Sequence, residues 1–270
     1  MGCGSWTPHD WDSYSKSSIA GKSAAGIYTS KMMKAEFDPK DIPVRESRDS
    51  ADHPSSNAII IGLDVTGSMS DILEGVAKKL NVLVSEILDR KPVTDPQIMF
   101  NAIGDAMCDT TPFQATQFES DIRIAEQLTQ LYFERGGGGN GFESYPLAWY
   151  FAAMHTDIDC LNKRNQKGFL FTMGDDCYST KLTAREIKQI FGDTVERDIP
   201  VDELREHIQE IPKDKPVYVI CQSGLRSYIA CRILSGYGFT CFNFSGGFRL
   251  YSSVMHDRRL AETASVCGMD

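Results

Sequence analysis

The segment around Cys221 combines residue types whose spacing suits thiol chemistry. An apolar run, Val217–Ile220, leads into the cysteine, and a short glycine-containing run separates the cysteine from Arg226, where a helical pattern begins. A loop between a strand and a helix turns successive backbone N–H groups toward one point, and the positive end of the helix dipole adds to them. Both effects favour the thiolate, so we expect the Cys221 thiol to be reactive near neutral pH.

This segment resembles the active-site loop of rhodanese-type sulfurtransferases. The flanking sequences Ile199–Arg205 and Asn243–Phe248 match the same family, and the resemblance covers about residues 198 to 255. It implies that Cys221 takes up a sulfane sulfur as a persulfide, with thiosulfate or a persulfide as donor, and that Arg226 binds an anionic group. The resemblance assigns the anion cradle to Gln222, Ser223, Gly224 and Leu225.

The resemblance lacks the front half of that family's domain. A complete rhodanese domain begins with a further strand, helix and strand, and no such segments precede Ile199. Two interpretations of Cys221 therefore remain open, a working sulfur carrier and an inert thiol in a relic loop. Cys231 and Cys241 fall inside the next predicted helix and strand, where we expect them to fill the core.

A second group of side chains suits metal chemistry. Asp64, Thr66 and Ser68 alternate in the turn that directly follows the apolar run Ala58–Leu63. Alternate residues of a tight turn can direct their oxygens at one point, and hard divalent cations prefer oxygen ligands. A structural interpretation stays open, in which Thr66 and Ser68 only cap the following helix.

This turn resembles the metal-ion-dependent adhesion site of von Willebrand factor A domains, and the resemblance covers roughly residues 57 to 195. It implies that Asp64, Thr66 and Ser68 hold Mg²⁺ or Mn²⁺. A later loop of that family adds an aspartate, for which Asp175 fits, with Asp176 as the alternative. The implied partner is a protein that offers a carboxylate to the metal, and no organic cofactor is expected.

The second loop of the site departs from the family's common pattern. Here a glycine-rich stretch, Gly136–Gly141, leads to Glu143. Some family members carry an acidic residue after such a stretch, so Glu143 is the expected ligand, with Asn140 and Ser144 as alternatives. A solvated turn at Asp175 is the structural interpretation of the third loop.

Alternating strand and helix patterns must position both groups. Continuous apolar runs predict buried strands at Ala58–Leu63, Gln97–Ile103 and Lys167–Met173. Helical spacing after the first strand places one face at Ile72, Val76, Leu80, Leu83, Val84 and Ile87. Thr183 and Glu186 predict a capping box at the start of a later helix. The fold class is therefore α/β, a doubly wound, mainly parallel sheet with helices on both faces.

Four parts are expected along the chain. They are an irregular N-terminal arm at 1–56, a von Willebrand factor A-like domain at 57–197, a rhodanese-like segment at 198–258 and a tail at 259–270. The absence of a Gly, Ser or Pro linker favours one shared sheet, so the rhodanese-like segment would supply its closing strands. The arm is either disordered or ordered by the packing of Trp6, Trp11, Tyr14 and Tyr28.

Composition narrows the partners and the compartment. A net charge of −9 and a pI near 5.1 provide no broad attraction to nucleic acid or anionic lipid. The apolar runs are much shorter than the ~20 residues of a membrane-spanning helix, and no secretory signal is recognisable. Eight scattered cysteines without a CxxC pair indicate reduced thiols and a cytoplasmic location.

The two groups predict functions of different classes. The first prediction is a metal-dependent protein-binding module that carries a reactive cysteine loop, because the N-terminal resemblance is the more complete. The alternative is a sulfurtransferase that works through a Cys221 persulfide. Whether the chain is an enzyme stays open at this point.

Overall fold

A computed structural model describes residues 4–134, 142–200, 208, 211, 213–214, 216–220, 225–244, 248 and 250–255. The chain divides into two compact units, Met1–Val201 and Asp202–Asp270. Each unit has its own packed apolar residues.

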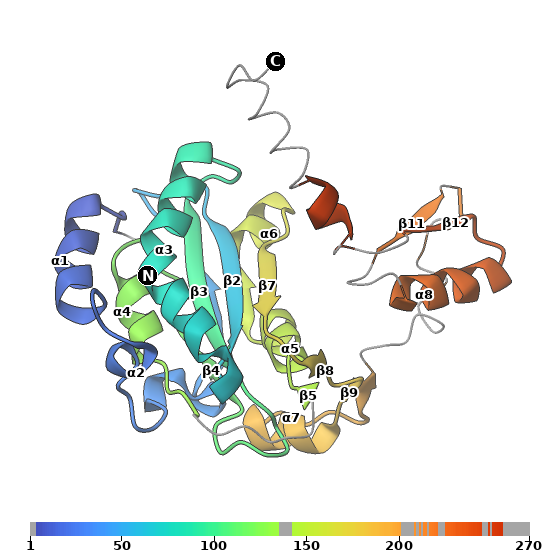
Figure 1. Ribbon diagram of the computed structural model, residues 1–270, viewed down its shortest axis with the longest axis horizontal. Helices are drawn as coiled ribbons and strands as arrows, with labels where there is room; N and C mark the ends of the chain where they lie inside the picture. Colours follow the sequence, from blue (N-terminus) through green and yellow to red (C-terminus); the bar gives the residue numbers. More distant parts are fainter. Residues whose placement is uncertain are drawn as a thin grey trace. The chain divides into compact units, whose positions relative to one another are not determined.

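A four-stranded sheet lies at the centre of the first unit (Figure 1). β2 (Asn57–Asp64) lies between β3 (Pro96–Ile103) and β7 (Phe169–Met173) and runs parallel to both. β4 (Phe113–Ala115) pairs antiparallel with β3 at one edge. All eight residues of β2 are buried, as expected for a strand with parallel neighbours on both sides.

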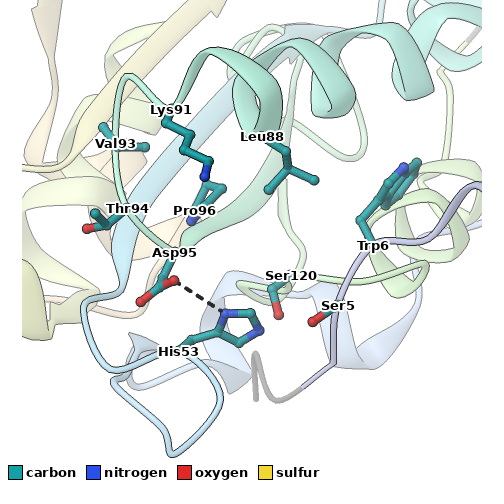
Figure 2. A pocket seen from close by; sticks show the side chains of 10 residues that line it. All are labelled: Ser5, Trp6, His53, Leu88, Lys91, Val93, Thr94, Asp95, Pro96 and Ser120. Atoms are coloured by element: carbon teal, nitrogen blue, oxygen red, sulfur yellow. Dashed lines mark ion pairs between the residues drawn. The ribbon is translucent and has the colours of Figure 1, made fainter.

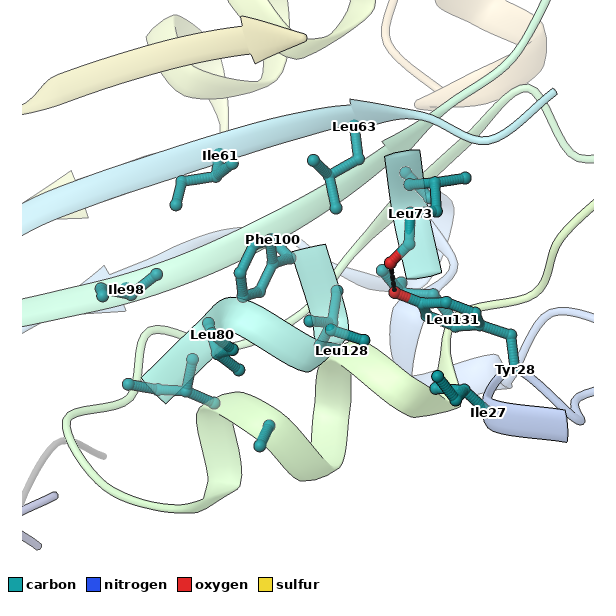
Figure 3. Packing of buried hydrophobic residues seen from close by; sticks show 14 of the residues in the cluster. Ile27, Tyr28, Ile61, Leu63, Leu73, Leu80, Ile98, Phe100, Leu128 and Leu131 are labelled. Carbon is teal, nitrogen blue, oxygen red and sulfur yellow. Dashed lines mark hydrogen bonds between the residues drawn. The ribbon is translucent and has the colours of Figure 1, made fainter. Parts of the chain in front are cut away.

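Two helices, α3 (Ser70–Arg90) and α4 (Arg123–Gln130), pack on one face of this sheet. The buried residues of α3 are Leu73, Ala77, Leu80 and Val84, whose steps of three and four residues form one stripe. Figure 3 shows this packing around Phe100 of β3 and Ile61 of β2. The sequence predicted Ile72 and Leu83 on the same face, but they are 50% and 40% exposed.

The opposite face is covered by α5 (Pro146–Met154) and α7 (Ala184–Ile190). Alternate residues of β2 separate the two cores, because Ile60 belongs to this one and Ile61 to the other. The predicted capping box of α7 is confirmed. Thr183 Oγ1 accepts a hydrogen bond from the Glu186 N–H at 3.1 Å, and a Glu186 carboxylate oxygen accepts one from the Thr183 N–H at 2.7 Å.

The N-terminal arm is ordered by packing on the first unit. It contains α1 (Pro8–Ser18), α2 (Ala24–Ile27), the short 3₁₀ helices η1 (Ala35–Phe37) and η2 (Pro39–Asp41), and β1 (Arg45–Ser47). The Trp6 indole N–H donates to Asn81 Oδ1 of α3 at 2.9 Å. The Tyr28 hydroxyl donates to the Leu73 carbonyl at 3.0 Å, the dashed line of Figure 3. Of the two interpretations of the arm, the ordered one is therefore correct over residues 4–56.

β7 forms an edge of the sheet within the described part of the chain. Its register with β2 places Phe169, Phe171 and Met173 on the α3 face. These side chains are 44%, 54% and 37% exposed. Within the described first unit no element covers this part of the face, so β7 is only partly buried there, unlike the predicted buried strand.

The described part of the second unit contains a parallel pair of strands joined by a helix. β11 (Val217–Val219) runs parallel to β12 (Cys241–Asn243), and α8 (Leu225–Gly236) connects them. Ile208, Leu234 and Phe239 form its buried cluster. Within the described residues β11 pairs with β12 alone, so the closing of the larger sheet by the C-terminal strands stays a prediction.

Shorter elements complete the chain. They are η3 (Gly67–Met69), β5 (Phe142–Glu143), β6 (Thr156–Ile158), α6 (Asp159–Arg164), β8 (Cys177–Tyr178), β9 (Lys181–Leu182) and β10 (Ile199–Pro200). The mixed α/β character and the mainly parallel pairing follow the expectation. No described helix is long and apolar enough to cross a membrane. The five described cysteines are free thiols.

Candidate functional site

Asp64 anchors the first candidate site at the carboxyl end of β2. Its side chain is fully buried. One carboxylate oxygen accepts hydrogen bonds from the Thr66 N–H at 2.9 Å and the Thr66 hydroxyl at 2.7 Å. The other accepts one from the Tyr145 hydroxyl at 3.0 Å. The turn and the start of α5 therefore hold this carboxylate in one orientation.

The predicted first and third loops meet at this point. The Ser68 hydroxyl lies 3.4 Å from the Thr66 hydroxyl and donates to Asp175 Oδ1 at 3.2 Å. The parallel pairing of β2 with β7, which places Leu63 beside Met173, brings the two loops together. Ser68 and Asp175 are exposed while Asp64 is buried, so the group opens to solvent on one side.

Gly174 permits the close approach of the third loop to Tyr145. A Cβ atom at Gly174 would lie 1.8 Å from the Tyr145 hydroxyl, so a larger residue would displace the Tyr145 ring. Burial and the neighbouring Asp64 carboxylate both raise the pKa of Tyr145, which keeps it a hydrogen-bond donor.

Glu143 is a buried carboxylic acid of this site that lacks a hydrogen-bond partner among the described residues for one of its oxygens. It is 4% exposed, and its Oε2 atom has no hydrogen-bond partner. The pairing of β5 with β8 places it beside Tyr178, directly after the third loop. Burial raises the pKa of Glu143 to about 8, and the carboxylates of Asp64, Asp109, Asp105 and Asp176 add to the shift.

Two aspartates near Glu143 are not among the residues predicted from the sequence. Asp105 is 3% exposed and follows β3 directly, and Asp109 accepts a hydrogen bond from its N–H at 2.7 Å. Burial raises the pKa of Asp109, with further contributions from Glu134, Asp105 and Asp64. The signal was a Gly-Asp pair after a predicted strand beside β2, where the ends of parallel strands meet.

Ser144 and Asn140 were the alternative ligands expected from the second loop. The Ser144 hydroxyl accepts from the Ala106 N–H at 3.0 Å, so it joins this loop to the one after β3. Asn140 lies outside the described residues, as do Gly136–Gly139 and Gly141. The site therefore consists of Asp64, Thr66, Ser68, Asp175 and the nearby Glu143.

The donors of this group are oxygens, which suits a hard divalent cation. Among the described residues, no group of three or more His, Cys, Asp or Glu side chains could hold a metal ion by themselves. A cation here would depend on the Thr66 and Ser68 hydroxyls as well. The unpartnered Glu143 oxygen is the structural feature that a cation would satisfy.

The second candidate site lies at the end of β11. Cys221, Gln222, Ser223 and Gly224 lie outside the described residues, as do the side chains of Leu225 and Arg226. The surrounding elements are in place, since β11 ends at Val219 and α8 begins at Leu225. Cys231 is buried, which raises its thiol pKa, so its predicted place in the core is confirmed.

Comparisons with known proteins concern the C-terminal part of the chain. The model of the family described as "Rhodanese-like domain" matches residues 183–253. The chain is also similar to "Uncharacterized protein YqhL" of Bacillus subtilis (strain 168), at 43% identity over 64 residues. The aligned part is 23% of this chain and 51% of that protein, so the chain spans about half the length of this curated relative.

These matches establish a rhodanese-like segment at residues 183–253. The matched segment begins at Thr183, the capping residue of α7, whereas the sequence placed the boundary at residue 198. The resemblance of the N-terminal part to von Willebrand factor A domains stays a prediction.

Proposed function

We propose that the chain carries sulfane sulfur on Cys221. The observation that supports this function is the rhodanese-like match over residues 183–253, which includes the whole segment from the cysteine to Arg226. The described geometry around it agrees with a strand, a loop and a helix in that order. This function ranks above the metal-dependent module, in the reverse of the order expected from the sequence, because the comparisons support only the C-terminal resemblance.

The proposed step transfers a sulfur atom from thiosulfate to the Cys221 thiolate. The Cys221 thiolate attacks the outer sulfur of thiosulfate, a new sulfur–sulfur bond forms, and the bond to the sulfonate sulfur breaks. Sulfite leaves with that electron pair, so Cys221 becomes a persulfide. An acceptor nucleophile then takes the outer sulfur, and the Cys221 thiolate is restored. Arg226 is the residue proposed to bind the anionic donor.

Mass spectrometry of the intact protein tests this function. After thiosulfate treatment, we expect an adduct of one sulfur atom in the wild type and none in Cys221→Ser. Cys177→Ser is the matched control, because Cys177 is a free, exposed cysteine outside the rhodanese-like segment, and its loss should leave the adduct unchanged. An adduct that persists in Cys221→Ser, or its absence from the wild type, would contradict the proposal.

A second candidate function is a divalent-cation site at Asp64, Thr66, Ser68, Asp175 and Glu143 that recruits a protein carboxylate. The strand order β4–β3–β2–β7 and the meeting of the first and third loops support a von Willebrand factor A-like arrangement. The unpartnered oxygen of the buried Glu143 favours a cation in particular. A bound Mg²⁺ or Mn²⁺ would supply positive charge that orients the partner's carboxylate.

Thermal melts with Mg²⁺, Mn²⁺ and EDTA test the cation site. A ligand at about a hundred times its Kd adds ~2.7 kcal/mol of stability, so the midpoint should rise with either metal. The rise should disappear in Asp64→Ala and remain in Asp52→Ala, since Asp52 is an exposed aspartate outside the site. Equal midpoints in all three conditions would contradict this function.

A further inference from the structure

A cavity of about 450 Å³ lies at the end of α3, beside the start of β3 (Figure 2). It is at the amino ends of the strands, because Pro96 pairs with Asn57 there. The candidate cation site is at the other end of the eight-residue strand β2, roughly 23 Å away at ~3.3 Å per residue. The cavity is therefore separate from the candidate cation site.

Apolar side chains form much of the wall of this cavity. Trp6, Leu88, Val93 and Pro96 contribute to it. The hydrogen bond to Asn81 fixes the Trp6 ring, and Leu88 is an exposed leucine, at 36%, on the last turn of α3. Pockets for small organic ligands usually have this size and a mainly apolar lining with a few polar groups.

Some polar groups of the cavity have hydrogen-bond or ion-pair partners among the described residues, and at least one does not. His53 and Asp95 form an ion pair at 3.7 Å. The His53 ring also bonds to the Gly4 carbonyl at 2.8 Å, and the Asp95 carboxylate accepts a hydrogen bond from the Ser55 N–H at 2.8 Å. The Lys91 ammonium group has no hydrogen-bond or ion-pair partner in the part of the chain that the structure describes. Figure 2 shows its side chain extending toward the cavity.

Lys91 also has a backbone conformation that favours glycine. It ends α3 at φ 47° and ψ 48°, and its N–H bonds to the Ile87 carbonyl at 3.0 Å. Glycine is the usual residue at this helix position, because a side chain there is strained. Asp95 has a φ of 41°, but its hydrogen bonds to Ser55 and Asn57 account for that geometry. The backbone N–H of Lys91 closes the helix, whereas its side chain makes no hydrogen bond or ion pair with the described residues.

We propose that this cavity binds a small molecule that combines a flat apolar body with one anionic group. The apolar body packs against Trp6, Leu88 and Val93, and the anionic group pairs with Lys91. Residues held in sparsely populated backbone conformations cluster at active sites and ligand sites. Here the apolar wall selects the body of the ligand, and the single unpaired cation selects its charge.

Fluorescence titration of the full chain with 8-anilinonaphthalene-1-sulfonate tests this proposal, because that probe has an aromatic body and one sulfonate. Lys91→Gln should weaken its binding about fivefold, the scale of an exposed ion pair. N-phenyl-1-naphthylamine has the same body without the charge, so its affinity should not change in Lys91→Gln. Lys79→Gln removes another exposed lysine of α3 and should leave both probes unaffected.

Two further variants separate the pocket from other apolar surface. Leu88→Glu and Val93→Glu should weaken both probes, and circular dichroism verifies that each variant is folded. Lys91→Gly should raise the melting temperature by removing the strained side chain and still weaken the sulfonate probe. Unchanged sulfonate binding in Lys91→Gln, or unchanged binding of both probes in folded Leu88→Glu and Val93→Glu, would overturn the proposal.

Discussion

At the scale of single residues, burial raises the pKa of Glu143, and the neighbouring carboxylates raise it further. Glu143 is buried among Asp64, Asp105 and Asp109, and its Oε2 has no protein donor. A charged carboxylate without partners is costly to bury, so the group keeps its proton to a higher pH than usual. A bound cation would remove this cost by another route, since it supplies the missing positive charge.

The stability of the metal-free protein should therefore fall as pH rises. In EDTA, the folded-state pKa of Glu143, about 8, lies above the ordinary glutamate pKa of 4.5. Between these values the folded protein keeps a proton that the unfolded chain has released. The stabilisation is thus complete below the unfolded-state pKa. It is lost as the pH rises toward the folded-state pKa, at up to about 1.4 kcal/mol per pH unit.

Urea unfolding in EDTA measures this loss of stability at several pH values between about 5 and 8, the range over which Glu143 loses its proton. Glu143→Gln should flatten the dependence, because glutamine stays neutral throughout. Glu196→Gln alters an exposed glutamate and should leave the slope as in the wild type. The same slope in Glu143→Gln as in the wild type would show that another group causes it.

At the scale of elements, local capping determines where α7 begins. The side chain and backbone of Thr183 and Glu186 bond to each other reciprocally, which satisfies two N–H groups that a helix start leaves free. Local sequence was sufficient to predict this geometry, because both residues lie within one helical turn.

Thr183→Ala should lower the free energy of unfolding by about 1 kcal/mol, since the side-chain acceptor of the cap is lost. Thr183→Ser keeps a hydroxyl at the same position and should retain most of the stability. Denaturant melts of the two variants measure the difference. Equal losses in both would mean that the methyl group, and not the cap, stabilises this helix end.

The buried stripe of α3 required more than local sequence. The apolar residues of this helix cover more than one face, and Ile72 and Leu83 fit a helical period as well as Leu73 and Ala77 do. Packing against α4 and the N-terminal arm selects the stripe that contains Leu73, because the arm's Tyr28 bonds to its carbonyl. Periodicity alone could not choose between overlapping stripes.

At the scale of the whole molecule, the two units differ in the size of their cores. Unit 1 has two large buried clusters, one on each face of its sheet, whereas the described buried cluster of unit 2 is Ile208, Leu234 and Phe239. A small core provides less apolar burial to offset the loss of chain entropy. We therefore predict two unfolding transitions, with unit 2 at the lower temperature.

Matched substitutions assign the two transitions in calorimetry. Leu234→Ala should lower only the first transition and Leu80→Ala only the second, because each removes a buried leucine from one unit. The replacement of a buried leucine by alanine usually lowers the free energy of unfolding by about 2–5 kcal/mol. A single transition that both variants lower would show that the units unfold together.

The sequence by itself determined those features whose parts are neighbours in the chain. The strand before Cys221, the helix after it and the turn from Asp64 to Ser68 each occupy a few consecutive residues, so local patterns were enough. The resemblance of the C-terminal segment to rhodanese-like domains likewise depended on contiguous motifs, and the comparisons bear it out.

Tertiary structure alone decided which distant side chains share a site. Asp105 and Asp109 come near Glu143 only because β3 pairs with β2, and Tyr145 reaches Asp64 only because α5 packs on the sheet. It also decided that the apolar strand β7 lies at an edge. Hydrophobic periodicity reports which residues avoid water but not which element covers them, so contacts between segments far apart in the chain depend on the packing of the whole unit.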